Sequence, residues 1–269
     1  MSVPPLTWLY VPADRPDRIE KAIASAAHAV IVDLEDGVAP ERKADARAGL
    51  ADVLSERRRK PVYVRVNAGV AEDLEVLAVV QISGVVVPKV AAPEDVPATP
   101  FPVNCLIESA AGLEAAYEIA RTRGVAGISL GESDLRSETG ALEAGLDWAR
   151  GRIVNAAVAA GLPRPPQSVY PHVRDEEGLA RSCAHGRELG HLGRTAIHPA
   201  QLAVIEQAYL PTADELEGAR ETVERLEATG AGTLGGGEFV DAAMLGAARQ
   251  IVALAESYGT ATHPTRGDS

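Results

Sequence analysis

The sequence predicts an α/β protein: a (β/α)8 TIM barrel with a C-terminal helical extension. Short apolar runs alternate with amphipathic stretches, and eight such pairs fit into about 200 residues. Several runs are continuously apolar, which is typical of parallel strands covered on both faces. Apolar residues make up 46% of the 269-residue chain and aromatic residues only 4%, so its core must consist of Ala, Val, Leu and Ile.

Eight apolar runs are the candidate strands. In chain order they are Thr7–Val11, Ala29–Asp33, Val62–Val66, Val85–Pro88, Val103–Ile107, Ala126–Leu130, Gln167–Tyr170 and Arg194–Ile197. An open, doubly wound sheet is the alternative fold, because a pattern of apolar residues does not reveal whether the sheet closes.

Amphipathic stretches that follow the strands predict the helices. They are Asp17–Ala27, Pro40–Arg59, Ala71–Ile82, Ser109–Thr122, Glu143–Ala160, Asp175–Leu189 and Pro199–Tyr209. Residues 91–101, between the fourth and fifth strands, are rich in proline and predict only a short helical turn.

The last part of the chain predicts a separate extension. Thr212–Thr229 forms a strongly charged helix, residues 230–237 include five glycines and predict a flexible link, and residues 238–258 predict a final helix. We therefore divide the chain into a catalytic barrel (1–210), a helical extension that packs on the barrel or completes the site of a neighbouring subunit (211–260), and a disordered tail (261–269).

Charge and cysteine content narrow the possible functions. The formal net charge of −12 argues against nucleic-acid binding, which needs a basic surface. Cys105 and Cys183 are far apart and lack metal-site spacing, so we expect buried thiols in a reducing compartment. Neither a signal-peptide pattern nor an apolar run near the ~20 residues of a membrane span is visible. The expectation is a soluble, cytoplasmic protein without a membrane partner.

Ionisable side chains gather where the predicted strands end, which is where such barrels carry their functional residues. They are Asp33, Glu35, Asp36, Arg65, Lys89, Glu108, Glu132, Asp134 and His198. So many carboxylates at one face raise one another's pKa values, and a divalent cation would relieve their repulsion. Oxygen ligands favour a hard ion, so Mg²⁺ is the expected cofactor; no His or Cys cluster suits Zn²⁺.

Each of these residues also has a structural interpretation. Glu108 and Asp134 would equally suit the caps of the turns that follow them, although their place in the barrel favours metal ligation. Arg65 lies inside an apolar strand, where a charge is rarely buried without purpose, and a structural ion pair with an acid after the second strand is the alternative. His172 and His198 are interpreted as helix caps or supporting residues rather than bases.

At these positions the sequence resembles the citrate lyase β-subunit-like family of the HpcH/HpaI aldolase superfamily, with the malyl-CoA and citramalyl-CoA lyases. The resemblance covers nearly the whole chain, and Ala13 departs from it where the first motif usually has glycine. The matching motifs are Leu9–Pro16, Val32–Val38, Val64–Asn67, Pro88-Lys89, Ile107–Gly112, Gly131–Leu135 and Ile197–Gln201.

The resemblance implies a Mg²⁺ ion and assigns its surroundings. Glu108 and Asp134 match the direct metal ligands, and Glu108 also borders the substrate. Arg65 matches the residue that binds the carboxylate or keto oxygen of the substrate. Glu35 and Asp36 match neighbours that reach the metal through water.

The resemblance also implies a CoA thioester and a homo-oligomer, with a trimer favoured. Arg15 and Lys21 match positions that approach the CoA phosphates. Asp241, within Phe239-Val240-Asp241, matches a general base supplied by a neighbouring subunit; a cap of the last helix is its structural alternative.

The resemblance therefore implies a carbon–carbon lyase that cleaves or forms a small β-hydroxyacyl-CoA, with an acyl-CoA and a 2-keto acid as the other reactants. Three alternatives stay open: a class II pyruvate-type aldolase acting on CoA-free substrates, a hydroxyacyl-CoA thioesterase, and a citrate lyase β-subunit that needs an acyl-carrier partner. A barrel that binds a ligand without turnover would have little need of so many acids in one place.

Overall fold

The computed structural model describes residues 3–229, 231–233 and 239–261. It divides into two compact units. The larger unit is Pro5–Ile205, and the smaller one combines the N-terminal end up to Pro4 with the chain from Glu206 onward. The predicted tail lies outside the described residues from 262 onward, as do residues 230 and 234–237 of the predicted glycine link.

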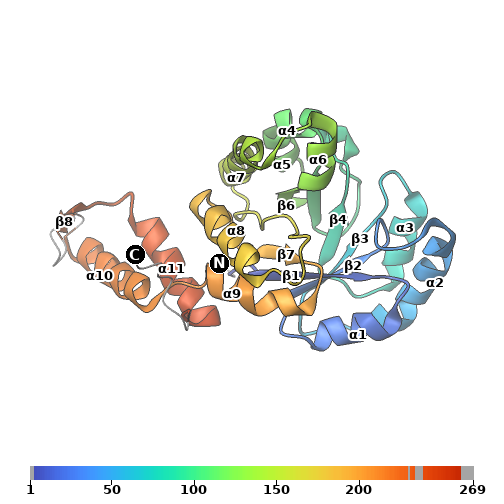
Figure 1. The fold of residues 1–269 in the computed structure, drawn as a ribbon, viewed down its shortest axis with the longest axis horizontal. Coiled ribbons are helices and arrows are strands. Elements are labelled where there is room, and N and C mark those ends of the chain that lie inside the picture. The colour runs from blue at the N-terminus through green and yellow to red at the C-terminus, as the bar shows by residue number, and fades with distance from the viewer. Residues whose placement is uncertain (1–2, 230, 234–238, 262–269) are drawn as a thin grey trace. The chain divides into compact units, whose positions relative to one another are not determined.

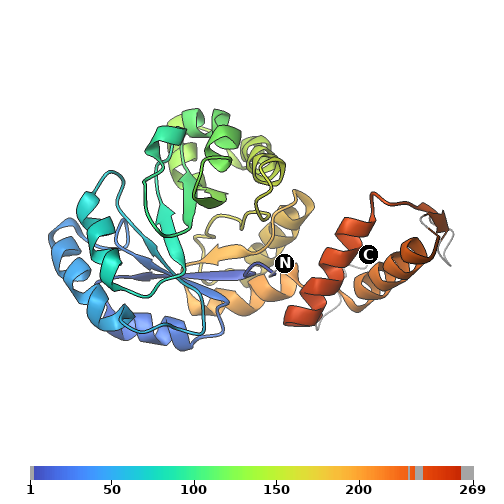
Figure 2. The ribbon, with the colours of Figure 1, turned by 180° about the vertical axis from the view of Figure 1, so that it is seen from behind.

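Seven parallel strands form one curled sheet in the larger unit (Figure 1). They are β1 (Thr7–Pro12), β2 (Ala29–Asp33), β3 (Val62–Arg65), β4 (Gly84–Val87), β5 (Val103–Ile107), β6 (Val125–Leu130) and β7 (Arg194–Ala196). Hydrogen bonding gives the order β6-β5-β4-β3-β2-β1-β7. Helices lie around the outside of the curl in both views (Figures 1 and 2). The predicted α/β class and its parallel strands are thus confirmed.

The seventh predicted strand, Gln167–Tyr170, forms only one parallel bridge, between Gln167 and Arg194. Prolines at 165, 166 and 171 surround this segment, and proline cannot donate to a strand ladder. Toward β6, the Ser168 hydroxyl donates to the carbonyl oxygen of Leu130. The structure therefore shows a curled sheet of seven strands, and closure into a full barrel is not confirmed.

The predicted helices form, but most are shorter. In the larger unit they are α1 (Pro16–Ala24), α2 (Lys43–Leu54), α3 (Ala71–Val76), α4 (Ala110–Glu114), α5 (Ala116–Ala120), α7 (Asp147–Ala159), α8 (Glu176–Glu188) and α9 (Leu202–Tyr209), the last of which runs into the smaller unit. The proline-rich segment between β4 and β5 contains the short turn Pro93–Asp95, as expected. One helix, α6 (Glu132–Thr139), was not predicted; it ends at Gly140, whose φ of 70° suits a helix C-terminus.

The smaller unit contains a helix pair and a short strand pair. Helix α10 (Ala213–Thr229) packs against α11 (Leu245–Tyr258), and β8 (Gly232–Thr233) pairs antiparallel with β9 (Phe239–Val240). The last helix thus begins later than the predicted start at 238. Nowhere in the described part of the chain is a helix both long and apolar enough to span a membrane.

Side-chain alternation places polar groups at the top of the inner face of the sheet. An apolar cluster lies on that face: Ile31, Val86 and Leu106, with Trp8, Tyr10 and Tyr63 packed against it. Two residues further along their strands come Asp33 after Ile31 and Glu108 after Leu106. The carboxyl ends of the strands therefore carry charged side chains above an apolar floor. Cys105 and Cys183 are fully buried, as predicted.

Candidate active site

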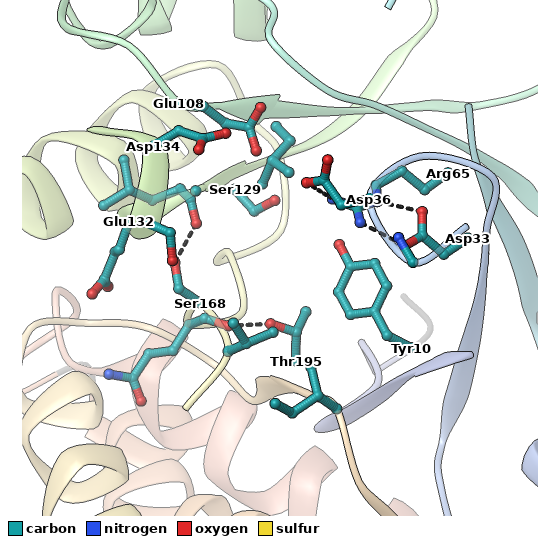
Figure 3. Close-up of a pocket in the computed structure, with 18 of the residues that line it drawn as sticks. Tyr10, Asp33, Asp36, Arg65, Glu108, Ser129, Glu132, Asp134, Ser168 and Thr195 are labelled. Atoms are coloured by element: carbon teal, nitrogen blue, oxygen red, sulfur yellow. Dashed lines mark hydrogen bonds and ion pairs between the residues drawn. The ribbon is translucent and has the colours of Figure 1, made fainter. Parts of the chain in front are cut away.

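A pocket of about 400 Å³ opens at the carboxyl ends of the strands (Figure 3). Apolar, hydroxyl and charged side chains share its wall. The polar ones are Tyr10, Asp33, Asp36, Arg65, Glu108, Ser129, Glu132, Ser133, Asp134, Gln167, Ser168 and Thr195. Four residues predicted for the site, Asp36, Arg65, Glu108 and Asp134, therefore line one pocket.

Two carboxylates hold Arg65 at this pocket. Asp33 accepts hydrogen bonds from Nε at 2.7 Å and Nη2 at 2.6 Å, and a Glu35 oxygen lies 2.8 Å from Nη1. Asp33 is itself fixed, because it accepts the backbone N–H groups of Glu35 and Gly37 at 2.9 and 2.8 Å. A guanidinium has five N–H groups, and these contacts use three of them. The exposed carboxylate of Asp36 lies further off, 3.7 Å from Nη1, so donors remain for one anionic group in the pocket.

Lys89 orients two further carboxylates. Its backbone N–H donates to Glu108 Oε2 at 3.0 Å, and its Nζ lies 3.2 Å from Glu35 Oε1. Its φ of 58° is uncommon for a residue with a side chain. Such backbone strain concentrates at functional sites. The sequence left open which acid pairs with which cation; Asp33 pairs with Arg65, and Glu35 lies between Arg65 and Lys89.

Glu108 is a buried acid whose nearby positive charge does not offset the effects of burial and of neighbouring carboxylates on its pKa. It is 7% exposed. Burial raises the pKa of Glu108 to about 7, and the charges of Glu35 and Asp134 act in the same direction. The backbone N–H of Lys89 and the charge of Arg65 oppose this shift. Neighbouring carboxylates thus raise the pKa of Glu108, in line with the effect expected from the sequence.

Helix α6 brings Asp134 to the pocket in its first turn. Glu132, the first residue of α6, lies two residues before Asp134 and points away from Glu108 and Asp134 (Figure 3). Its carboxylate accepts from Nε and Nη2 of Arg150 on α7 at 2.9 and 2.6 Å. Arg150 is 3% exposed and also binds Asp147 at 2.9 Å. This ion-pair cluster ties α6 to α7 and so positions Asp134.

The pKa of Glu108 predicts that, without divalent cations, stability falls as the pH rises. The folded-state value of about 7 exceeds the ordinary 4.5, so the protonated form stabilises the fold. This contribution is complete below the unfolded-state pKa and is lost as the pH rises through about 7. Urea unfolding in EDTA should show a loss of up to about 3 kcal/mol between acidic and mildly alkaline pH. An unchanged pH dependence in Glu108→Gln would contradict this origin.

Arg15 and Lys21, predicted to approach the CoA phosphates, do not line the pocket. Arg15 immediately precedes α1 and Lys21 lies within it. Both lie near the carboxylate of Asp17, at 3.5 and 3.7 Å, and their side chains are 42% and 79% exposed. They are therefore accessible to an anionic ligand, and their role stays a prediction.

Asp241 lies in the smaller unit, in the turn between β9 and α11. Its Oδ1 accepts the backbone N–H of Ala243 at 2.9 Å, and its side chain is exposed. Because α11 begins only at Leu245, this bond stabilises the turn rather than capping the helix itself. The role of Asp241 as a base stays a prediction.

The two histidines considered as bases have structural contacts. His198 Nδ1 accepts the backbone N–H of Ala200 at 3.1 Å and caps the short helix Pro199–Gln201, as predicted. The ring of His172 lies edge-on to Tyr170, with 5.5 Å between ring centroids. Neither side chain lines the pocket.

Several side chains of the site were not predicted, among them Tyr10, Ser168 and Arg150. Tyr10 faces the pocket from β1, and its ring lies 5.0 Å from Cζ of Arg65. Strand alternation is a signal for Tyr10, but it identifies the inner face only once neighbouring strands are in register. Arg150 sits among other charged residues of a helix, so its burial has no signal in the sequence.

The comparisons with known proteins agree on one family. The HpcH/HpaI aldolase/citrate lyase model matches residues 6–199. The chain is 35% identical over 272 residues to a (3S)-malyl-CoA thioesterase of Cereibacter sphaeroides, covering 93% of this chain and 94% of the relative. It is 29% identical over 299 residues to an L-malyl-CoA/beta-methylmalyl-CoA lyase of the same species, covering 92% and 93%.

A solved structure agrees with this result. The protein CitE from Mycobacterium tuberculosis, in complex with magnesium, acetoacetate and coenzyme A, matches with a TM-score of 0.80 and 33% identity. The match covers 94% of this chain and 98% of CitE. The chain therefore belongs to the HpcH/HpaI aldolase/citrate lyase family.

Proposed function

We propose that the chain is a Mg²⁺-dependent carbon–carbon lyase for a small β-hydroxyacyl-CoA of the malyl-CoA or citramalyl-CoA type, with acyl-CoA and a 2-keto acid as the other reactants. The observation that carries the proposal is one pocket lined by Arg65 and by the carboxylates Glu108 and Asp134. A guanidinium suits the carboxylate of a keto acid, and carboxylates suit a hard cation. The lyase relative and the CoA-bound CitE support a CoA thioester.

The acids of the pocket fit Mg²⁺. Among the described residues, no three His, Cys, Asp or Glu side chains form a ready cluster for a metal. Proteins usually hold Mg²⁺ with one or two carboxylates and leave other positions to water and substrate. Glu108 and Asp134 are such a pair, and the raised pKa of Glu108 marks an acid that a cation would stabilise. Glu35 and Asp36 would act through water.

Residues of the chain bind and orient the substrate. Bound Mg²⁺ would polarise the keto or hydroxyl oxygen. Arg65 binds the substrate carboxylate and fixes the keto-acid half beside Glu108 and Asp134. In cleavage the hydroxyl gives its proton to a base, the bond to the thioester α-carbon breaks, and its electron pair forms the enolate. Asp241 is the proposed base, and it returns the proton to the α-carbon; condensation is the reverse.

The remaining assignments are part of the same proposal. Asp241 would act on a neighbouring subunit of a homo-oligomer, with a trimer favoured, and Arg15 and Lys21 would bind the CoA phosphates at the exposed start of α1. The sheet would close as a barrel along residues 167–170, which the Gln167 bridge and the Ser168 hydrogen bond support. The protein would work in the cytoplasm.

A panel of CoA thioesters tests the proposal. Malyl-, citramalyl-, β-methylmalyl- and hydroxymethylglutaryl-CoA would each be incubated with Mg²⁺ and with EDTA. We expect Mg²⁺-dependent release of a 2-keto acid from at least one of them. Turnover of CoA-free hydroxy-keto acids alone would favour the aldolase instead, and inactivity on both sets would favour a carrier-dependent subunit.

Hydrolysis of the same thioester is the second candidate, because the thioesterase relative is 35% identical over most of both chains. The same binding groups would hold the hydroxyacyl-CoA, and water would attack the thioester carbonyl. The products differ: hydrolysis releases a free CoA thiol and a hydroxy acid, with no keto acid.

Gly131→Ala is expected to reduce turnover without removing any charged group. A Cβ at Gly131 would lie 2.5 Å from Cγ and 2.7 Å from Oε1 of Glu108, so the carboxylate must move. A displacement of about 1 Å at a reacting centre can cost about 10²-fold in rate, so kcat/KM should fall by about that factor. Gly151→Ala on α7 is the control, because nothing lies within 4 Å of its Cβ position. Equal activity of both variants would show that the position of Glu108 is unimportant.

A further inference from the structure

Tyr10 is a rigid part of the pocket wall that none of the assigned roles uses. Its ring packs against the inner apolar cluster of Ile31, Val86 and Leu106. The guanidinium of Arg65 lies over the ring face, with 5.0 Å between Cζ and the centroid. Apolar contacts and the cation–π contact with Arg65 therefore hold the ring in place.

The Tyr10 hydroxyl is unused within the protein. Tyr10 lines the pocket, and its hydroxyl makes no hydrogen bond to any other residue in the described ranges. It points to the side of the pocket where Arg65 and Asp36 lie (Figure 3). By contrast, Ser168 and Thr195 donate to the carbonyl oxygens of Leu130 and Gln167. The hydroxyl of a buried tyrosine usually has a hydrogen-bond partner, and a ligand in the pocket can supply one.

The surroundings of this hydroxyl, burial above all, make it a donor rather than a base. Burial raises the pKa of Tyr10 above its ordinary value, the carboxylates of Asp33, Glu108 and Glu35 add to the shift, and Arg65 opposes it. The hydroxyl therefore stays protonated over the working pH range. A protonated donor beside a guanidinium suits an anionic acceptor.

We propose that the Tyr10 hydroxyl donates a hydrogen bond to the same substrate carboxylate that Arg65 binds. This inference rests on the proposed function and deepens it. Arg65 addresses one carboxylate oxygen with the N–H groups that Asp33 and Glu35 leave free, and Tyr10 addresses the other. Tyr10 thus selects for the keto-acid half of the substrate and has no contact with the CoA half.

Tyr10→Phe tests this assignment, because it keeps the ring under Arg65 and removes only the hydroxyl. The measurement is calorimetric binding of glyoxylate and pyruvate in Mg²⁺, and separately of CoA. We expect the dissociation constant of the better-bound keto acid to rise about tenfold or more, and KM for the hydroxyacyl-CoA to rise alongside it. The dissociation constant of CoA and kcat should change less than about twofold.

Tyr63→Phe is the matched control, since Tyr63 packs against the same apolar cluster but does not line the pocket. It should bind the keto acid like the wild type. Equal keto-acid binding by Tyr10→Phe and the wild type would overturn the role of Tyr10 and leave the proposed function standing. A wild type that binds neither keto acid would overturn both proposals.

Discussion

Glu108→Gln is expected to abolish catalysis, with kcat/KM for the preferred hydroxyacyl-CoA falling at least about 10³-fold. The amide keeps the size of the side chain and an acceptor for the N–H of Lys89. It loses the negative charge that would hold a divalent cation. Steady-state kinetics at saturating Mg²⁺ would measure the loss, and more Mg²⁺ should not restore the rate.

The same variant should be at least as stable as the wild type in EDTA above neutral pH. The reason is that ionised Glu108 is a buried charge close to Glu35 and Asp134, and glutamine removes its cost. Glu118→Gln on α5, which removes an exposed acid 3.7 Å from Arg121, is the control and should change neither property. Near-normal activity of Glu108→Gln would remove Glu108 from the mechanism.

Arg65→Lys is expected to lower both stability and activity, although it keeps the positive charge. A lysine has one ammonium group and cannot bind both oxygens of Asp33 and also Glu35. Asp33 and Glu35 are each 4% exposed, so they would lack adequate partners in a buried site. Breaking a buried pair typically costs about 3–5 kcal/mol, and urea unfolding should show a loss near the lower end.

A surface pair of similar geometry provides the control. Arg58 binds Glu20 through both Nη nitrogens, at 2.7 and 3.4 Å, with both residues partly exposed. Arg58→Lys should cost less than about 1 kcal/mol and leave turnover unchanged. If Arg65→Lys lowered the free energy of unfolding no more than Arg58→Lys does, the contacts of Arg65 with Asp33 and Glu35 would not stabilise the fold more than a surface ion pair.

The parts of the fold that depend on local pattern could be predicted from the sequence. Continuous apolar runs identified the strands because parallel strands need no polar face. Glu108 stood out because a carboxylate directly follows such a run. Arg65 stood out because it interrupts one.

The parts that depend on long-range contacts could not be predicted. The direction of α6 depends on the bond between Glu132 and Arg150, eighteen positions apart, and the sequence does not reveal that these two meet. The hydroxyl of Tyr10 becomes notable only because the residues around it leave it without a partner. Residues 167–170 form only one bridge to the sheet, because prolines surround them and limit their pairing. A count of apolar residues does not detect this limit.

The position of Asp241 is a different case. The motif around it suggested a base that acts on a neighbouring subunit, and this role stays a prediction. Its local structure is a turn stabilised by the N–H of Ala243. Its assignment as a base rests on the resemblance of the motif.

Product balance in a single reaction distinguishes a carbon–carbon lyase from a hydrolase. Wild-type protein would be incubated with malyl-CoA and citramalyl-CoA in Mg²⁺, and 2-keto acid and free CoA thiol would be measured in the same samples over time. We expect one keto acid for each hydroxyacyl-CoA consumed, with no free thiol and no reaction in EDTA. Free thiol appearing one for one with substrate loss, without keto acid, would contradict the lyase and identify the protein as a hydrolase of the same thioester.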